Sequence, residues 1–255
     1  MKPLAHRRAG TAGKPPVLLI HGFGGRMETW LNMEVALERD AALLLVDLPG
    51  HGRSRDSHEP VGAGQAAKAV AATLDHLGGE PVFVVGHSMG GAVGAVLAMT
   101  RPDLVRGALL LAPGGMGPEV DAAALRQYAR EYDLDELARV LRRFYAPGTR
   151  IPRGLVEELA REREDPATRR AHGEILLSIL KGDNQHTLSM QRLGEATPPI
   201  HVMWGDADEI IPSAQLANLP ENVTRELLPG IGHMVHLEAT QAVARKLRTL
   251  IAEAV

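Results

Sequence analysis

The sequence predicts an α/β protein, in which a mostly parallel sheet is covered by helices on both faces and carries an inserted helical cap. Short aliphatic runs closed by Gly or Pro alternate with longer helical patterns, which is typical of strands buried on both faces and joined by crossover helices. This alternation stops between Gly117 and Thr197, where almost every segment has a helical pattern. The first observation predicts the sheet and the second predicts the cap.

Each predicted strand is a short apolar run, and each predicted helix fills the space between two runs. The strands are PVLLI (16–20), ALLLVDL (42–48), PVFVVG (81–86), GALLLAP (107–113), PIHVMWG (199–205) and TRELLPG (224–230). The helices are expected over 27–38, 61–77, 89–100, 213–218 and 236–253.

The segment between Gly117 and Thr197 is expected to form about four helices, because prolines at 118, 147, 152 and 166 divide it. The helices are expected over 125–132, 134–145, 155–163 and 167–180. No internal repeat or low-complexity linker separates this segment from the rest. We therefore expect an α/β core over residues 1–116 and 197–255, with a helical cap inserted over residues 117–196.

Composition narrows the classes of function. The 255 residues are 45% hydrophobic and 23% charged, with a net charge of −3 and basic residues only in short mixed runs, so nothing favours a nucleic-acid partner. The absence of cysteine excludes disulfides and thiolate chemistry. No segment reaches the roughly 20 apolar residues of a membrane span, and the N-terminus lacks the apolar stretch of a signal peptide. We expect a cytoplasmic protein without a membrane span.

No metal or cofactor site is expected. The residues His51, Asp56 and His58 are close in sequence, but they fall in a loop that lacks the ordered spacing of metal ligands. The sequence does not indicate an oligomeric state.

Ser88 is the first candidate for chemistry. It lies in VVGHSMGGAV, directly after a buried strand and directly before a helical pattern. A serine on so sharp a turn needs small neighbours two residues away, and Gly86 and Gly90 meet that requirement. The helix that begins at Met89 directs its free N–H groups toward the space over the serine, where an oxyanion would form.

A serine nucleophile needs a histidine as its base. His233 lies in the glycine-rich loop after the last predicted strand, where parallel sheets place their sites, and is preferred over His236, which is expected to start the final helix. His51 is expected to belong to a structural turn. Five histidines in polar surroundings are expected to be solvated, namely His6, His58, His76, His172 and His186.

A carboxylate should complete the arrangement. The loop after PIHVMWG offers Asp206, Asp208 and Glu209, and the residues alone do not choose among them. The order serine, acid, histidine is the one associated with the nucleophile-elbow fold.

Five motifs in this order resemble the α/β-hydrolase superfamily over almost the whole chain. They are HGFGG (21–25), DLPGHGRS (47–54), GHSMGG (86–91), WGDADEIIP (204–212) and GHMVHLE (232–238). The resemblance implies Ser88 as nucleophile, Asp208 as acid and His233 as base. It also implies an oxyanion hole from the backbone N–H groups of Phe23 and Met89, and a sheet of about eight strands that here lacks one at the N-terminus, with the cap inserted after the sixth.

The resemblance implies a serine hydrolase, and carboxylic esters of small to medium acyl groups need the fewest extra assumptions. The motifs are especially similar to the catalytic domain of acetyltransferase components of acetoin dehydrogenase complexes, so acyl transfer to a lipoyl or other thioester is an alternative. Because the chain starts about fifteen residues before its first predicted strand, we expect no tethered lipoyl arm and transfer in trans.

Two further alternatives remain. The meta-cleavage-product hydrolases break C–C bonds with the same residue types, but they often carry Trp shortly after the histidine, where this chain has Met234 and Val235. A ligand-binding receptor on the same fold would use the pocket without turnover, because a fold does not fix a function.

The cap is expected to decide the substrate. Some of its apolar residues should face an aliphatic pocket while most pack the cap on the core; the candidates are Met116, Leu125, Tyr128, Tyr132, Leu137, Leu141, Phe144, Tyr145, Leu176, Leu177 and Leu180. Asn184, Gln185 and His186 are candidates for polar substrate contacts, although a solvated loop is favoured.

Overall fold

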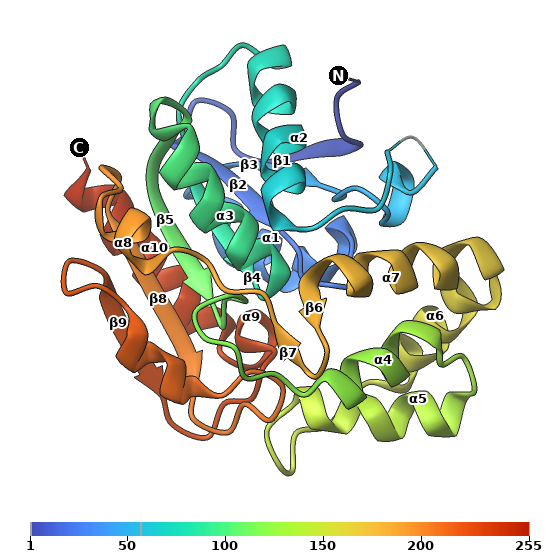
Figure 1. Ribbon diagram of the computed structural model, residues 1–255. Coiled ribbons are helices and arrows are strands. Elements are labelled where there is room, and N and C mark those ends of the chain that lie inside the picture. The colour runs from blue at the N-terminus through green and yellow to red at the C-terminus, as the bar shows by residue number, and fades with distance from the viewer. Residues whose placement is uncertain (1, 57, 255) are drawn as a thin grey trace.

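A seven-stranded sheet forms the centre of the molecule (Figure 1). The computed structural model describes residues 2–56 and 58–254. The sheet order is β1-β3-β2-β4-β5-β8-β9, and every neighbouring pair except β1 with β3 is parallel. The strands are β1 His6–Gly10, β2 Pro16–Ile20, β3 Ala42–Val46, β4 Val82–His87, β5 Val105–Leu111, β8 Ile200–Gly205 and β9 Thr224–Leu228. The α/β class predicted from the sequence is confirmed.

Helices cover both faces of this sheet. Helices α2 (Ala63–His76) and α3 (Met89–Thr100) lie side by side on one face, and α1 (Leu31–Leu37), α9 (Val235–Glu238) and α10 (Thr240–Glu253) lie on the other (Figure 1). Short 3₁₀ helices cover Met27–Trp30, Gly52–Ser54, Pro102–Leu104, Arg142–Phe144 and Ser213–Asn218. The predicted helix over 236–253 is thus two helices, which are separated at Ala239.

Strand β1 was not among the six strands predicted from the sequence. The seven strands of the sheet agree with the expected sheet of about eight strands less one at the N-terminus. Strand β1 pairs antiparallel with β3, from His6 opposite Val46 to Gly10 opposite Ala42. Its sequence, HRRAG, is polar because it lies at the edge of the sheet, where only one side of the strand needs a hydrogen-bonded neighbour. A charged edge strand lacks the apolar pattern by which the buried strands are predicted.

Four helices of the segment between β5 and β8 form the expected cap-like layer (Figure 1). They are α4 Ala122–Arg130, α5 Leu134–Leu141, α6 Arg153–Glu164 and α7 Pro166–Ile179. Counted along this chain, the insertion follows the fifth strand of the main sheet, which corresponds to the sixth of an eight-strand sheet that lacks its first strand. The segment also contains a hairpin that the sequence did not predict, made of β6 (Leu180–Lys181) and β7 (Asn184–Gln185), and a short helix, α8 (Met190–Gly194).

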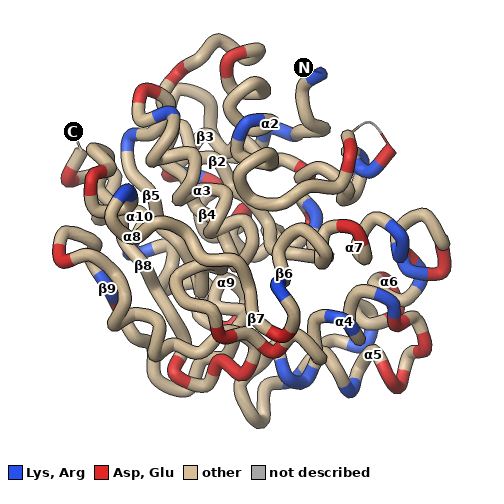
Figure 2. The backbone as a smooth tube through the Cα atoms, in the orientation of Figure 1, with Lys and Arg blue, Asp and Glu red and all other residues tan. Residues whose placement is uncertain are grey.

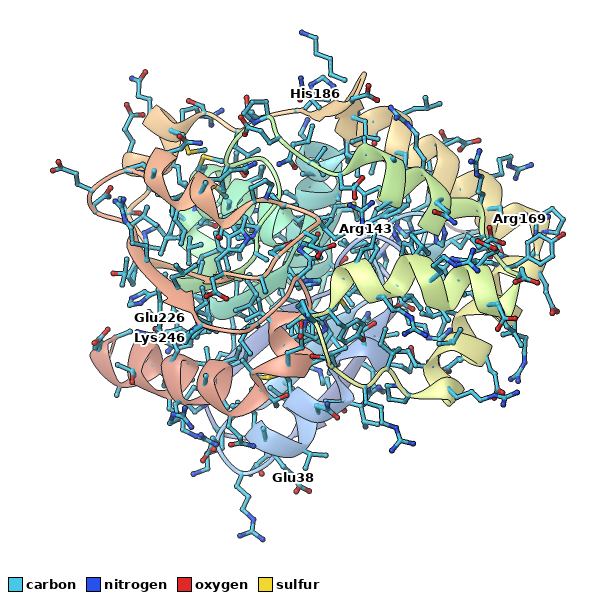
Figure 3. The ribbon with its side chains drawn as sticks, turned by 90° about the horizontal axis from the view of Figure 1, so that it is seen from below. Glu38, Arg143, Arg169, His186, Glu226 and Lys246 are labelled. Carbon is cyan, nitrogen blue, oxygen red and sulfur yellow. The ribbon has the colours of Figure 1, made fainter. Side chains whose placement is uncertain are left out.

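The inserted helices share one hydrophobic cluster with the sheet. Ion pairs join the same two parts: Arg55 bonds Asp165, and Arg143, which is labelled in Figure 3, pairs with Glu209. On the opposite side of the core, Figure 3 shows Glu226 of β9 beside Lys246 of α10. The segment is therefore packed as part of the fold.

Charged residues of both signs are interspersed over the surface, and the inserted helices carry many of them (Figure 2). Within residues 2–56 and 58–254, no helix is long and apolar enough to span a membrane. No group of three His, Asp or Glu side chains among these residues is arranged to hold a metal ion.

Candidate active site

Ser88 lies at the sharp turn between β4 and α3. Its backbone has φ 53° and ψ −116°, a conformation that is rare for a residue with a side chain and that marks strain at this position. The flanking glycines are required by space: a Cβ on Gly86 would lie 2.3 Å from the carbonyl oxygen of Gly90, and a Cβ on Gly90 would lie 2.2 Å from that of Ile20. The turn therefore closes only with glycine on both sides of the serine.

The structure brings Ser88, His233 and Asp208 into one hydrogen-bonded line, although they are up to 145 residues apart in sequence. Nε2 of His233 lies 3.0 Å from Oγ of Ser88, and Nδ1 of His233 lies 2.8 Å from Oδ2 of Asp208. A carboxylate only accepts, so Nδ1 donates to Asp208 and Nε2 is free to accept from the hydroxyl. This is the geometry that a serine nucleophile and its base require.

Asp208 differs from the two other acids of its loop in its hydrogen-bond partners. Its Oδ1 accepts from the backbone N–H groups of Ile210 and Ile211, at 2.8 and 2.9 Å, and its Oδ2 accepts from Nε1 of Trp204 at 3.0 Å. These donors fix the carboxylate toward His233 and satisfy it in a buried place. Only tertiary contacts distinguish it from its neighbours.

The other two acids point elsewhere. Asp206 accepts from the backbone N–H of Gly230 at 2.7 Å and so braces the turn after β9. Glu209 pairs with Arg143 at 3.7 Å on the surface. Neither carboxylate reaches the imidazole of His233 in this structure.

His236 is buried behind His233, in contact with the rings of Trp30 and His87. Burial, together with the neighbouring His233, lowers the pKa of His236 to about 3, which keeps its imidazole neutral. Neither of its ring nitrogens has a hydrogen-bond partner within the described residues. His236 therefore lies near the candidate site without contacting Ser88.

His87 is a residue that the sequence analysis did not single out. Its Nε2 donates to the backbone carbonyl of His233 at 2.9 Å, across 146 residues of sequence. Burial lowers its pKa well below the usual value. The sequence could have pointed to His87 through its place next to Ser88, because the turn that exposes the serine directs the preceding side chain into the protein.

The backbone N–H groups expected to form an oxyanion hole are those of Phe23 and Met89. The N–H of Met89 begins α3 and the N–H of Phe23 belongs to the loop after β2; neither has an acceptor among the residues that the structure describes. The loop is fixed from behind, because the Gly24 N–H donates to Nε2 of His51 and the Leu48 N–H donates to Nε2 of His21, both at 3.0 Å. His51 thus has the structural role that the sequence analysis expected.

His172 was expected to be solvated, and that expectation is wrong. The side chain is 1% exposed and its ring contacts those of Phe23 and His51, with centroids 5.4 and 5.5 Å away. Burial and the charge of the nearby Arg163 lower its pKa to about 3. The polar sequence around His172 belongs to the outer side of α7, whereas His172 lies on the side that packs against the loop holding Phe23.

A cavity of about 910 Å³ opens over Ser88. Of the apolar residues proposed to face a pocket, Leu125 and Leu180 line it, whereas Tyr132 and Leu177 are exposed at 51% and 81%. The others pack in the shared core. Much of the lining comes instead from α2 and α3, which the sequence analysis did not connect with the substrate.

The three polar residues near the hairpin, Asn184, Gln185 and His186, differ in whether they line the cavity. Gln185 lines the cavity, but its side chain accepts from the Gly115 N–H at 3.0 Å and donates to the Gly117 carbonyl at 2.9 Å. It therefore fixes the hairpin to the loop beside Ser88. His186 also lines the cavity and is exposed at the rim of the molecule (Figure 3), whereas Asn184 is exposed and does not line it.

Known proteins resemble this chain along nearly its full length. The acetyltransferase component of the acetoin cleaving system of Pseudomonas putida is 31% identical over 238 residues, covering 93% of this chain and 64% of that protein. The chain thus spans less than two thirds of that relative. A 2-hydroxy-6-oxononadienedioate/2-hydroxy-6-oxononatrienedioate hydrolase of Cupriavidus pinatubonensis is 30% identical over 257 residues, covering 92% and 86%.

The solved structures agree on the fold. A meta-cleavage product hydrolase from Pseudomonas fluorescens IP01 superimposes with a TM-score of 0.86 at 17% identity, covering 98% of this chain and 94% of that one. Such low identity supports the fold alone. Residues 17–246 match the model of the alpha/beta hydrolase family, and the chain belongs to that family.

Proposed function

We propose that the protein is a serine hydrolase that cleaves carboxylic esters of small to medium acyl groups through an acyl-enzyme on Ser88. The observation that carries this proposal is the hydrogen-bonded line from Ser88 through His233 to Asp208, at 3.0 and 2.8 Å, at the floor of an apolar cavity. A ligand-binding receptor would have no need of a base in contact with a strained serine.

The reaction follows from these positions. As Oγ of Ser88 attacks the carbonyl carbon, its proton moves to Nε2 of His233, while Asp208 holds the Nδ1–H tautomer and stabilises the imidazolium. The N–H groups of Phe23 and Met89 stabilise the oxyanion, and each such donor contributes roughly 3 kcal/mol to lowering the barrier. His233 then protonates the leaving alcohol. Water, activated by the same histidine, releases the acid.

Acyl transfer to a thiol is the second candidate. The similarity to the Pseudomonas putida acetyltransferase component favours it, because the same acyl-enzyme can be resolved by a thiol in place of water. The Cupriavidus pinatubonensis relative favours cleavage of a C–C bond in an oxo-dienoate in the same way. All three reactions would use Ser88, so the substrate distinguishes them.

The test has two parts. A fluorophosphonate should label Ser88, and the protein should turn over p-nitrophenyl acetate; Ser88→Ala should lose both, with a fall in rate of several orders of magnitude. Full activity of Ser88→Ala on the ester would exclude the proposal, and labelling without turnover would favour a receptor. A panel with an acetyl thioester and a ring-fission oxo-dienoate, compared by kcat/KM, then separates ester hydrolysis from the two alternatives.

A further inference from the structure

The cavity over Ser88 continues away from the inserted helices, between α2 and α3. Positions three or four residues apart lie on one face of a helix, and both helices turn such a face to the cavity. The lining residues on these faces are Ala92, Val96 and Thr100 of α3 and Ala67, Ala71 and Asp75 of α2. Small side chains therefore leave an open groove between two helices that otherwise pack closely.

The groove is long, since its lining along α3 runs from Ser88 to Arg101. Helices α2 and α3 run in the same direction, because Arg101 at the end of α3 pairs with Asp75 at the end of α2, at 2.9 Å. From Ser88 to Thr100 the helix advances about 18 Å, at 1.5 Å per residue. A strap at His186–Leu188 borders the groove, held where the Leu188 N–H donates to the Gly115 carbonyl at 2.8 Å. This shape suits a linear chain better than a ring system.

The charges along the groove are unbalanced. Lys68 and Arg192 both line the cavity, and neither side chain has a carboxylate partner among the described residues. Arg101 also lines it, but this guanidinium is already paired with Asp75 and Asp103. The one acidic residue of the lining, Asp75, is thereby neutralised. Two cations therefore remain to meet an anion in the groove.

The position of Lys68 sets the length of the ligand. It lies seven residues before Asp75, which places its backbone about halfway along the groove, about 9 Å from the level of Ser88. An extended chain advances about 3.5 Å per three backbone bonds, so about eight bonds span this distance. A chain of that length attached to the carbonyl at Ser88 would end beside Lys68.

We propose that the groove between α2 and α3 binds a linear acyl chain with a carboxylate at its far end, so that the substrates are monoesters of dicarboxylic acids of about eight carbons. This inference rests on the proposed ester hydrolysis and specifies its acyl group. The aliphatic part of the chain contacts Ala67, Ala92 and Val96. The terminal carboxylate meets Lys68 and Arg192.

The experiment compares two series of p-nitrophenyl esters, one of plain linear acids and one of acids with a terminal carboxylate, from two to twelve carbons. The leaving group is constant, so differences in kcat/KM report the acyl side. In the plain series we expect a gain of about fourfold per buried methylene. In the second series the carboxylate should disfavour turnover at four carbons and favour it near eight.

Charge variants test the cations. Lys68→Met with Arg192→Met should remove the preference for the terminal carboxylate, each change costing about two- to fivefold, the range of solvent-exposed ion pairs. Added salt should reduce the preference in the unmodified protein. Lys14→Met, at an exposed lysine that does not line the cavity, is the matched control and should change nothing. Terminal carboxylates that are disfavoured at every length would overturn the inference.

A steric pair tests the groove itself. Val96→Phe should fill it and abolish the gain from long acyl chains, whereas Met99→Phe, on the same helix but outside the lining, should keep that gain. Turnover of the acetyl ester shows that both variants are folded. If the acetyl ester is hydrolysed but chain length has no effect, this inference fails and the proposed hydrolysis stands; if no ester is hydrolysed, the proposed function itself fails.

Discussion

The buried polar groups on the two sides of His233 differ in whether they have hydrogen-bond partners. On one side, Ser88, His233 and Asp208 form a line in which both imidazole nitrogens have partners. On the other side, the ring of His236 contacts the rings of Trp30 and His87. Both ring nitrogens of His236 and Nε1 of Trp30 lack hydrogen-bond partners within the described residues. The first region has the geometry that the proposed proton transfer from Ser88 requires. The second is arranged to stay neutral.

The difference teaches that burial alone does not identify a base. His233 and His236 are both almost fully buried and only three residues apart. What separates them is the carboxylate: His233 donates to Asp208, whereas His236 is surrounded by neutral rings and its pKa is lowered to about 3. His87 connects the two regions, since its ring contacts His236 and its Nε2 bonds the His233 carbonyl.

The largest expected effect is that of Asp208→Asn, which removes the carboxylate that pairs with His233. The amide cannot hold the Nδ1–H tautomer as the carboxylate does, so kcat on p-nitrophenyl acetate should fall by about three to four orders of magnitude. Asp206→Asn, in the same loop, is the control and should keep most of the activity, because Asp206 only braces Gly230. Equal losses in the two variants would contradict the assignment of Asp208.

The second effect is a loss of stability in acid. Burial lowers the folded-state pKa of His21, His51, His87, His172 and His236 below the ordinary 6.5, to about 3 for the last two. The unfolded state therefore binds more protons, so the stabilisation is complete above pH 6.5 and is lost as the pH falls toward 3. Within that window His172 and His236 each contribute about 1.4 kcal/mol per pH unit, and the other three histidines act in the same direction.

Urea unfolding at pH 7.5, 6.5, 5.5 and 4.5 measures this dependence. The free energy of unfolding should be nearly constant between the first two values and should fall steeply below them. His76→Gln, which removes an exposed histidine, should leave the curve unchanged. An unfolding free energy that stays level down to pH 4.5 would show that these histidines are not held neutral.

A smaller effect is expected from His87→Phe. The phenyl ring keeps the contacts of the stack but leaves the buried His233 carbonyl without its donor, which costs about 1–2 kcal/mol and should lower kcat roughly tenfold. His87→Gln supplies an amide donor and should recover part of the rate. If His87→Phe leaves kcat and its pH profile unchanged, the bond to the His233 loop has no role in positioning the base.

The smallest effect is expected from His236→Phe, which changes the region whose polar atoms have no hydrogen-bond partners. Removing two unpartnered polar atoms while retaining a ring against Trp30 should stabilise the protein by about 1 kcal/mol at pH 7.5 and by more at pH 5, where the native imidazole resists protonation. Turnover of the acetyl ester should be unchanged. A variant that is less stable at both pH values would indicate that His236 has a favourable polar interaction.

Much of the fold could be predicted because the relevant patterns are local. The aliphatic runs that became β2, β4 and β5 are short and bounded, and α3 was expected over the residues that form it. Strand β1 could not be predicted, since an edge strand with the sequence HRRAG has no apolar pattern. The β6–β7 hairpin has only two residues in each strand and is held by Gln185, a contact that no periodicity reveals.

The candidate site divides in the same way. The type and order of its residues, and the need for Gly86 and Gly90 around Ser88, follow from the sequence, because a tight turn and a proton relay permit few residue types. The sequence could not place His172, which lies on the inner side of a helix with a polar outer side, nor could it find His87. Both depend on partners far away in the chain.

From the amino-acid sequence alone one can predict an α/β chain with an inserted helical segment, a serine at a strand-to-helix turn, and a later loop with acids followed by a histidine. The tertiary structure alone decided which acid faces His233, which of two nearby histidines is paired, and that the cavity over Ser88 extends between α2 and α3. The reason is physical: backbone conformation follows from neighbouring residues, whereas hydrogen-bond partners and cavities arise where distant segments pack together.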